Sequence, residues 1–184
     1  MSAAAESSAP LRVDLAGGWT DVPPYPTDFG GEVVNFAIKH RVRVRKSENE
    51  EDSDLEFDFP VSRGSGLGSS SAMNVALAAL KSPSLLENPE ELAEQAFLSE
   101  SKQNRCGRQD HWASALGGFN HLLFIGDSVE AMPFEPMNSS LNWLKKHLII
   151  SYSGISRNSG EIQESVLSRY SNGDDTVIQG LQKI

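Results

Sequence analysis

The sequence predicts an α+β fold, in which paired strands and separate helices occupy different stretches of the chain. In the first sixty residues, apolar and polar side chains alternate, which is the period of a strand with one exposed face. After residue 71, segments rich in Ala and Leu lie between helix start and stop signals. Of the 184 residues, 39% are hydrophobic and 22% are charged, which is a globular composition. This length is enough for one ordinary domain, or for one domain and part of another.

Three strands are predicted before residue 60. The first covers residues 11–15 and follows a small, polar stretch at 1–9 that we expect to be disordered. The prolines at 23–26 are expected to forbid a helix. A second extended region begins at residue 33 and continues into the basic strand 39–46, and a third strand covers 55–59.

Three helices are predicted in the middle of the chain, at residues 72–81, 89–103 and 109–116. The second has a strong start signal, since Asn88 suits the cap position and Pro89 the first helical position. The third is closed by two glycines.

The last third of the chain mixes both kinds of element. A strand is predicted at 119–125, followed by a turn. A short apolar run at 148–152 predicts a buried strand, and residues 160–170 predict a helix.

The charge and the cysteine content exclude some classes of protein. The net charge of -9 argues against nucleic acid as a partner, because binding a phosphate backbone needs clustered cations. The basic run 39–46 alternates with valine and is interpreted as a strand with one solvated face. No signal peptide or membrane span is visible, so we expect a cytoplasmic protein without a membrane partner. The single cysteine, Cys106, fits a reducing compartment and is interpreted as structural.

A Gly-Ser loop at residues 64–71 lies between the third strand and the first helix. Glycines let the backbone approach a ligand closely, and the N-terminus of the following helix favours an anion. A phosphate chain would suit this arrangement, and the alternative is a flexible connector. The loop has neither the lysine of a Walker P-loop nor the glycine that a dinucleotide fingerprint needs at Ser69.

Three segments, 12–21, 63–72 and 106–120, have motifs in the order RVDLAGGWTD, RGSGLGSSSA and CGRQDHWASALGGFN. Together they resemble the GHMP kinases, and the first segment is similar to L-fucose kinases and heptose-phosphate kinases. A fourth segment, 152–159, is similar to the turn that opens the second half of these kinases. The resemblance implies ATP and Mg²⁺ as cofactors, and a sugar or sugar phosphate as substrate.

The resemblance also implies site residues. It assigns the catalytic roles to Asp110 and Arg12, substrate binding to Asp21 and Arg157, and magnesium binding to Ser70 and Glu100. His111 stands where the family usually has glutamine. The ATP phosphates would be bound by Gly64, Ser65, Gly66, Leu67, Gly68, Ser69, Ser70 and Ser71.

Glu100 also stands out from the residues alone. On the helix that begins at Pro89, it shares a face with Ala93, Ala96 and Phe97. A carboxylate at the end of an apolar stripe is costly unless it is paired or binds a metal. The alternative is that Glu100 lies at the exposed end of this stripe.

Each of the other assignments also has a structural alternative. Arg12 could be an outward strand residue, and Asp21 could cap a turn. Asp110 could simply favour the first turn of its helix. Arg157 is as well explained by a surface turn.

The resemblance implies an N-terminal domain at 10–142 like the second domain of ribosomal protein S5. Residues 143–184 would be the truncated start of a ferredoxin-like C-terminal domain. The activity implied is transfer of the γ-phosphoryl group of ATP to a sugar hydroxyl, with the anomeric one favoured. The alternative is a non-catalytic fragment that binds a nucleotide or a protein partner, because nothing matches the family's third, glycine-rich motif. An uncovered sheet face would favour a homo-oligomer.

Overall fold

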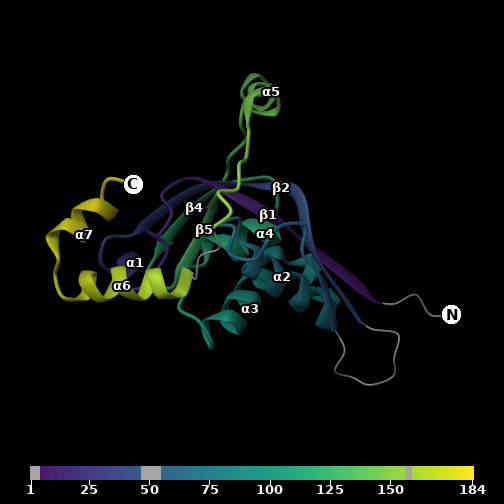
Figure 1. The fold of residues 1–184 in the computed structure, drawn as a ribbon, viewed down its shortest axis with the longest axis horizontal. Coiled ribbons are helices and arrows are strands. Elements are labelled where there is room, and N and C mark those ends of the chain that lie inside the picture. Colours follow the sequence, from purple (N-terminus) through teal and green to yellow (C-terminus); the bar gives the residue numbers. More distant parts are fainter. Residues whose placement is uncertain (1–4, 47–54, 156–158) are drawn as a thin grey trace.

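A five-stranded antiparallel sheet forms the centre of the protein (Figure 1). The structure is a computed structural model that describes residues 5–46, 55–155 and 159–184. The long strand β2 pairs with β1 along one edge, and with β3 and β4 at opposite ends of its other edge. β5 extends the sheet beyond β4. The strands are β1 (Glu6–Ala16), β2 (Gly31–Lys46), β3 (Leu55–Asp58), β4 (Phe119–Ile125) and β5 (Ser128–Met132). The fold is therefore mixed α and β with an antiparallel sheet, as the sequence predicted.

Three helices cover one face of the sheet (Figure 1). They are α2 (Ser69–Lys81), α3 (Pro89–Ser101) and α4 (Gln109–Leu116), with a 3₁₀ turn at Pro83–Glu87. The core between α2 and the sheet joins alanines of the helix to Leu11, Val42 and Val44, which are fully buried. Small side chains let the helix lie close to the strands, so the loop before α2 is held firmly against β1.

The N-terminal strand is longer than expected. Residues 6–9 were predicted to be disordered, but they pair with β2, where Glu6 lies opposite Arg45 and Ala9 lies opposite Val42. Ala9 is 2% exposed and belongs to the core. The prediction was wrong for these residues because their pairing partner lies more than thirty positions away in the chain. Residues 1–4 lie outside the described part.

The proline-rich segment does contain a helix, α1 (Tyr25–Asp28), contrary to the prediction. Pro26 lies in its first turn, where the N–H that proline lacks would have no acceptor within the helix. Tyr25 and Pro26 are buried.

The chain after β5 leaves the sheet. Helix α5 (Asn138–His147) projects from the rest of the molecule (Figure 1), and the structure gives it no buried residue. The run 148–152 was predicted to be a buried strand, but it is irregular and Ile149 is 87% exposed. Its apolar composition was misleading because, among the described residues, it pairs with no strand of the sheet.

Two further helices, α6 (Ser159–Ser171) and α7 (Asp175–Leu181), pack beside α1. Tyr25, Tyr170 and Leu181 form the contact, and the Tyr170 hydroxyl donates to Asp28 Oδ2 at 2.6 Å. These contacts tie the C-terminal part of the chain to the segment that follows β1.

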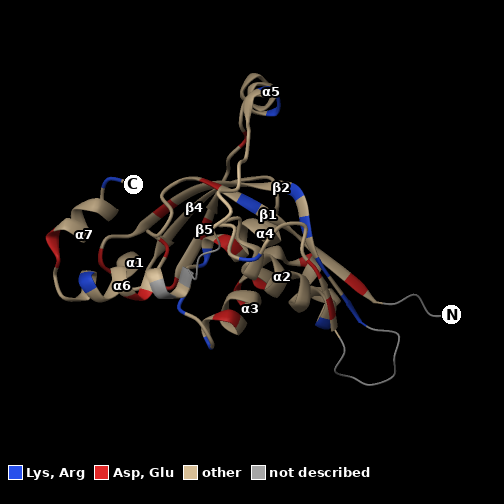
Figure 2. Cartoon of the chain, viewed as in Figure 1, with Lys and Arg blue, Asp and Glu red and all other residues tan. Residues whose placement is uncertain are grey.

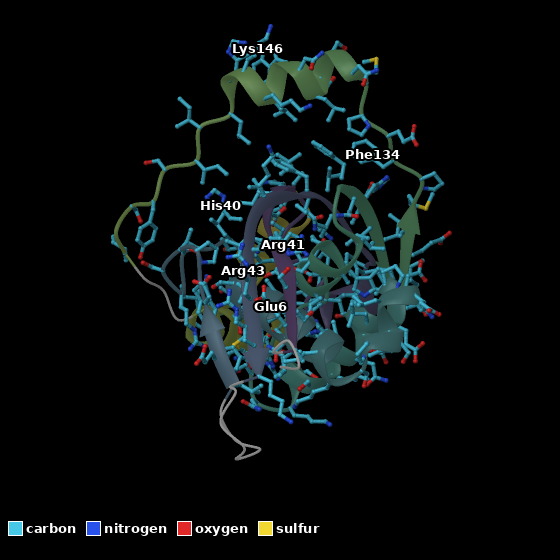
Figure 3. The ribbon with its side chains drawn as sticks, turned by 90° about the vertical axis from the view of Figure 1, so that its right-hand side faces the viewer. Glu6, His40, Arg41, Arg43, Phe134 and Lys146 are labelled. Carbon is cyan, nitrogen blue, oxygen red and sulfur yellow. The ribbon has the colours of Figure 1, made fainter. Side chains whose placement is uncertain are left out.

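The basic part of β2 is a strand with one solvated face, as predicted. Its Lys and Arg positions are blue in Figure 2. Val42 and Val44 are fully buried, whereas Arg43 and Arg45 form ion pairs with Glu6 at 3.7 and 2.6 Å. Figure 3 shows Glu6, Arg41 and Arg43 on this face. Within the described ranges, no helix has the length and apolar character needed to cross a membrane.

Candidate functional site

A cavity of about 510 Å³ lies where the loop before α2, the start of α4 and the C-terminal part of the chain meet. The lining includes side chains from β1, from the segment before α1 and from α6. The residues around it are Arg12, Asp14, Trp19, Asp21, Val22, Gly64, Ser65, Gly66, Ser71, Cys106, Gly107, Gln109, Asp110, Ser151, Tyr152, Ser153, Ile155, Ile162 and Gln163.

Arg12 joins the aspartate of α4 to the glycine loop. Its Nε donates to Asp110 Oδ1 at 2.7 Å, and its Nη1 donates to the carbonyl of Gly66 at 2.6 Å. The backbone of the same residue donates to Leu67 O at 3.1 Å. Burial alone would lower the pKa of Arg12, but the facing Asp110 carboxylate outweighs it and the pKa is raised. Arg12 is thus held as a cation that faces inward, which excludes the outward strand position.

The glycine loop passes directly over this ion pair. Gly68 has φ of +69° and caps α2. A Cβ at this position would lie 3.3 Å from Arg12 Cγ and 3.4 Å from Asp110 Oδ2. Glycine therefore allows both the left-handed turn and the close approach. The N-terminus of α2 has no side-chain cap, so its first N–H groups are available to an anion.

Asp21 is buried beside the first turn of α4, and it is 1% exposed. Its Oδ2 accepts the backbone N–H of Gln109 at 2.9 Å, and its Oδ1 accepts Nε2 of the same residue at 3.2 Å. A Cβ on Gly107 would lie 1.9 Å from Asp21 Oδ2, so the segment before α4 packs tightly on this carboxylate. Burial raises the pKa of Asp21 to about 6, although the hydrogen bonds from Gln109 oppose the shift.

Glu100 is 8% exposed and is the centre of a hydrogen-bond cluster, so it is not at an exposed helix end. Its Oε1 accepts the Ser70 hydroxyl at 2.5 Å. Its Oε2 accepts from Ser71 at 3.2 Å and Asn74 at 3.0 Å, and lies 2.8 Å from Nε2 of His111. Burial would raise the pKa of Glu100, but these donors, His111 first, lower it below its usual value. The carboxylate is therefore ionised, and the buried His111 ring donates to it.

The structure therefore brings together Arg12, Asp21 and Asp110 around one cavity, with Ser70 and Glu100 in contact with each other. Of the loop 64–71, the residues that line the cavity are Gly64, Ser65, Gly66 and Ser71. Among the described residues, no group of three or more His, Cys, Asp or Glu side chains could by itself hold a metal ion. Arg157 lies outside the described residues. Burial raises the pKa of Cys106 to about 12, which excludes a thiolate nucleophile.

Some residues of the site were not predicted from the sequence. Asp14 stands two positions after Arg12 on the same strand and lines the same cavity. The strand period could have revealed it, because residues two apart share a face. Gln109 and Gln163 had no such signal, since their contacts depend on how α4 and α6 pack.

Comparisons with known proteins relate part of this chain to a family of kinases. Residues 33–118 match the family described as GHMP kinases N terminal domain. A 31-residue segment is 61% identical to the L-fucokinase/L-fucose-1-P guanylyltransferase of Bacteroides fragilis, and covers 17% of this chain and 3% of that protein.

Two solved structures share the fold, each with a TM-score of 0.58 and 21% identity. One is a D-glycero-D-manno-heptose 1-phosphate kinase from Bacteroides thetaiotaomicron, for which the match covers 76% of this chain and 62% of that chain. The other is a sugar kinase candidate from Campylobacter jejuni, for which the match covers 97% of this chain and 73% of that chain. This chain therefore spans less than two thirds of the heptose kinase and a small part of the fucokinase.

Proposed function

We propose that this chain, which contains a GHMP kinase N-terminal domain, transfers the γ-phosphoryl group of ATP to a hydroxyl of a sugar. One observation supports this most strongly. Arg12 hydrogen-bonds both to Asp110 and to the glycine loop, so an acid–base group and a phosphate-binding loop share one fixed geometry. Phosphoryl transfer depends mainly on such positioning and on charge stabilisation.

The loop fits the phosphates of ATP. Gly66 has φ of +82°, and a Cβ added there would meet nothing within 4 Å, so its backbone faces open space. The first turn of α2 borders the same cavity through Ser71, and the free N–H groups of a helix N-terminus suit anionic oxygens. Residues 64–71 would bind the phosphate chain through these groups.

Ser70 and Glu100 fit Mg²⁺ as ligands. Mg²⁺ commonly takes one or two carboxylates, with phosphate and water oxygens completing its shell, so a larger cluster of acidic residues is not required. Oε1 of Glu100 accepts one hydrogen bond within the described residues, from Ser70, whereas Oε2 is held by three donors. When bound, the ion would neutralise charge on the phosphates.

Asp110 would accept the proton of the sugar hydroxyl, and Arg12, its ion-pair partner, would stabilise negative charge beside it. Asp21 would bind a second hydroxyl of the sugar from the buried side of the cavity. We favour the anomeric hydroxyl as acceptor, because one relative is named both as an L-fucokinase and as an enzyme for L-fucose-1-P, whose phosphate is on carbon 1.

We further propose the domain division 10–142 and 143–184, with an S5-like first part and the beginning of a ferredoxin-like second part. The regular elements described within 143–184 are helices, which leaves the ferredoxin-like sheet a proposal. A reducing compartment such as the cytoplasm would suit Cys106.

A second candidate is a non-catalytic role in binding a protein. It is favoured by the exposed apolar side chains of the projecting α5 and the segment after it, such as Trp143 at 61% and Ile149 at 87%.

Titration of the chain with ATP, with and without Mg²⁺, separates the two candidates. The kinase predicts nucleotide binding that Mg²⁺ strengthens, and formation of a sugar phosphate in long incubations with free sugars. Absence of ATP binding at millimolar concentration, in a sample that unfolds cooperatively, would overturn the kinase.

A further inference from the structure

Four side chains of the cavity present buried oxygen atoms that lack a hydrogen-bond partner among the described residues. They are Oδ1 of Asp14, Oγ of Ser65, Oε1 of Gln109 and Oε1 of Gln163. Buried polar atoms in native proteins are nearly always satisfied, so unpaired oxygens around one cavity point to an absent ligand. Ser65 belongs to the glycine loop, which leaves the other three oxygens for a second ligand. A ligand with several O–H donors would satisfy them.

The position of the Gln109 amide explains why its oxygen is free. Its Nε2 donates to Asp21 Oδ1 at 3.2 Å, so the nitrogen side faces that carboxylate and the oxygen faces elsewhere. Asp14 also lies near the nitrogen of this amide: a Cβ on Gly18 would lie 2.0 Å from Asp14 Oδ2 and 3.5 Å from Gln109 Nε2. Both carboxylates are therefore on the nitrogen side of the amide, and neither meets its oxygen.

The charges of the cavity favour a neutral ligand beside Asp14, Asp21 and Gln109. Asp14, Asp21 and Asp110 line it, whereas Arg12 is the one cation among the described lining residues. Arg12 is already bound to Asp110 and to the carbonyl of Gly66. A phosphate group on the sugar would meet carboxylates there, and like charges in a buried site repel strongly.

We infer that the cavity selects an unphosphorylated, polyhydroxylated sugar, with Asp14, Gln109 and Gln163 as further hydroxyl-binding residues beside Asp21. This inference rests on the proposed sugar kinase function and narrows its substrate class. Gln163 lies on α6, beyond the segment 33–118 that matches the family, so part of the specificity comes from the C-terminal part of the chain.

The test is calorimetric binding to the full chain, with and without Mg²⁺ and a non-hydrolysable ATP analogue. The probes are free hexoses and heptoses, and the same sugars with a phosphate at the end opposite the anomeric carbon. We expect at least one free sugar to bind about tenfold or more tightly than its phosphorylated form, as the loss of a hydrogen bond and added repulsion would give.

Two variants test the residues. Gln163→Leu should weaken free-sugar binding about tenfold and leave the affinity for the nucleotide analogue unchanged. Gln103→Leu is the matched control, since Gln103 is exposed and does not line the cavity. Gln163→Ala provides a second substitution if leucine disturbs folding, which thermal unfolding would reveal. Asp14→Asn should narrow the difference in affinity between free and phosphorylated sugars.

The outcomes separate the inference from the function. Tighter binding of the phosphorylated sugars, binding of no sugar, or unchanged sugar affinity in folded Gln163 variants would overturn the inference while nucleotide binding stands. If the ATP analogue does not bind but free sugars are still preferred, the proposed kinase function is rejected. The inferred selectivity of the cavity for free sugars would then remain.

Discussion

At the scale of single residues, Asp110 decides whether the site can perform acid–base chemistry. Its partner Arg12 is 2.7 Å away, so Asp110→Asn keeps the shape of the pair but loses the proton acceptor. We expect turnover to fall by about 10²–10⁴-fold, which is the usual contribution of a general base, with nucleotide affinity nearly unchanged. Steady-state ADP release measures the turnover, and nucleotide titration of the same preparation measures the affinity. Retention of full turnover would remove Asp110 from the mechanism.

Asp21 makes the stability of the protein depend on pH. Its pKa in the folded chain is raised from 3.8 to about 6, chiefly by burial. Between these two values the folded state binds more protons than the unfolded state, so the free energy of unfolding falls as pH rises through this window. The shift corresponds to about 3 kcal/mol at neutral pH, as an order of magnitude.

Asp21→Asn should remove this contribution. Denaturant unfolding between pH 4 and pH 7 should show a flatter profile and a more stable variant at pH 7. The asparagine oxygen can still accept the backbone N–H of Gln109. Rotation of the Gln109 amide by 180° would turn its Oε1 toward the new amide, from which it could accept. Sugar binding should weaken at the same time. A variant that is less stable than the parent at pH 7 would contradict the assignment of a buried charge.

The sequence identified most of these residues but not their partners. Motif order predicted Arg12, Asp21 and Asp110, and the structure places all three around one cavity. Gln163 could not be predicted in this way, because it depends on the packing of α6 against the segment after β1. Nothing local in the sequence signals such a contact.

At the scale of elements, the loop before α2 is the part most sensitive to a single change. Gly66 has φ of +82°, which a β-branched residue adopts only at a cost, although a Cβ would have free space. Gly66→Val should therefore distort the loop and weaken ATP binding at least tenfold, without loss of cooperative unfolding. Gly126→Val provides a control, because Gly126 also has positive φ with free space but lies in the β4–β5 turn away from the cavity. Equal ATP affinity in both variants would reject the phosphate loop.

Elements with strong local signals were predicted well. The helix 109–116 and the strand 119–125 have the predicted bounds, because glycines and an apolar period mark their ends. The run 148–152 was predicted wrongly, because burial depends on a partner surface that sequence does not show. Helices α5 and α7 and strand β5 were not predicted.

At the scale of the whole molecule, the exposed apolar side chains gather beyond β5. Met137 is 73% exposed, Trp143 61%, Ile149 87% and Ile155 62%. Met137 and Trp143 belong to the start and middle of the projecting α5 region, whereas Ile149 and Ile155 lie after that helix. The chain after α5 leads back to the cavity, where Ile155 is one of the lining residues. A surface of this kind favours association between molecules.

The last prediction concerns the 184-residue chain as a catalyst. Phosphoryl transfer requires that water be kept from the transferring group. Here one wall of the cavity is the irregular segment 151–155, and its Tyr152 and Ile155 are 46% and 62% exposed. We therefore expect turnover below about 1 s⁻¹, the lower end for kinases, and a sample that forms dimers or larger species. Light scattering and an ADP-release assay on the same fractions measure both properties. Trp143→Ser should shift the population toward monomer, because it removes the largest exposed apolar side chain of α5. Fast turnover by a strictly monomeric sample would refute this expectation, because it would mean that the exposed wall already excludes water from the reacting groups.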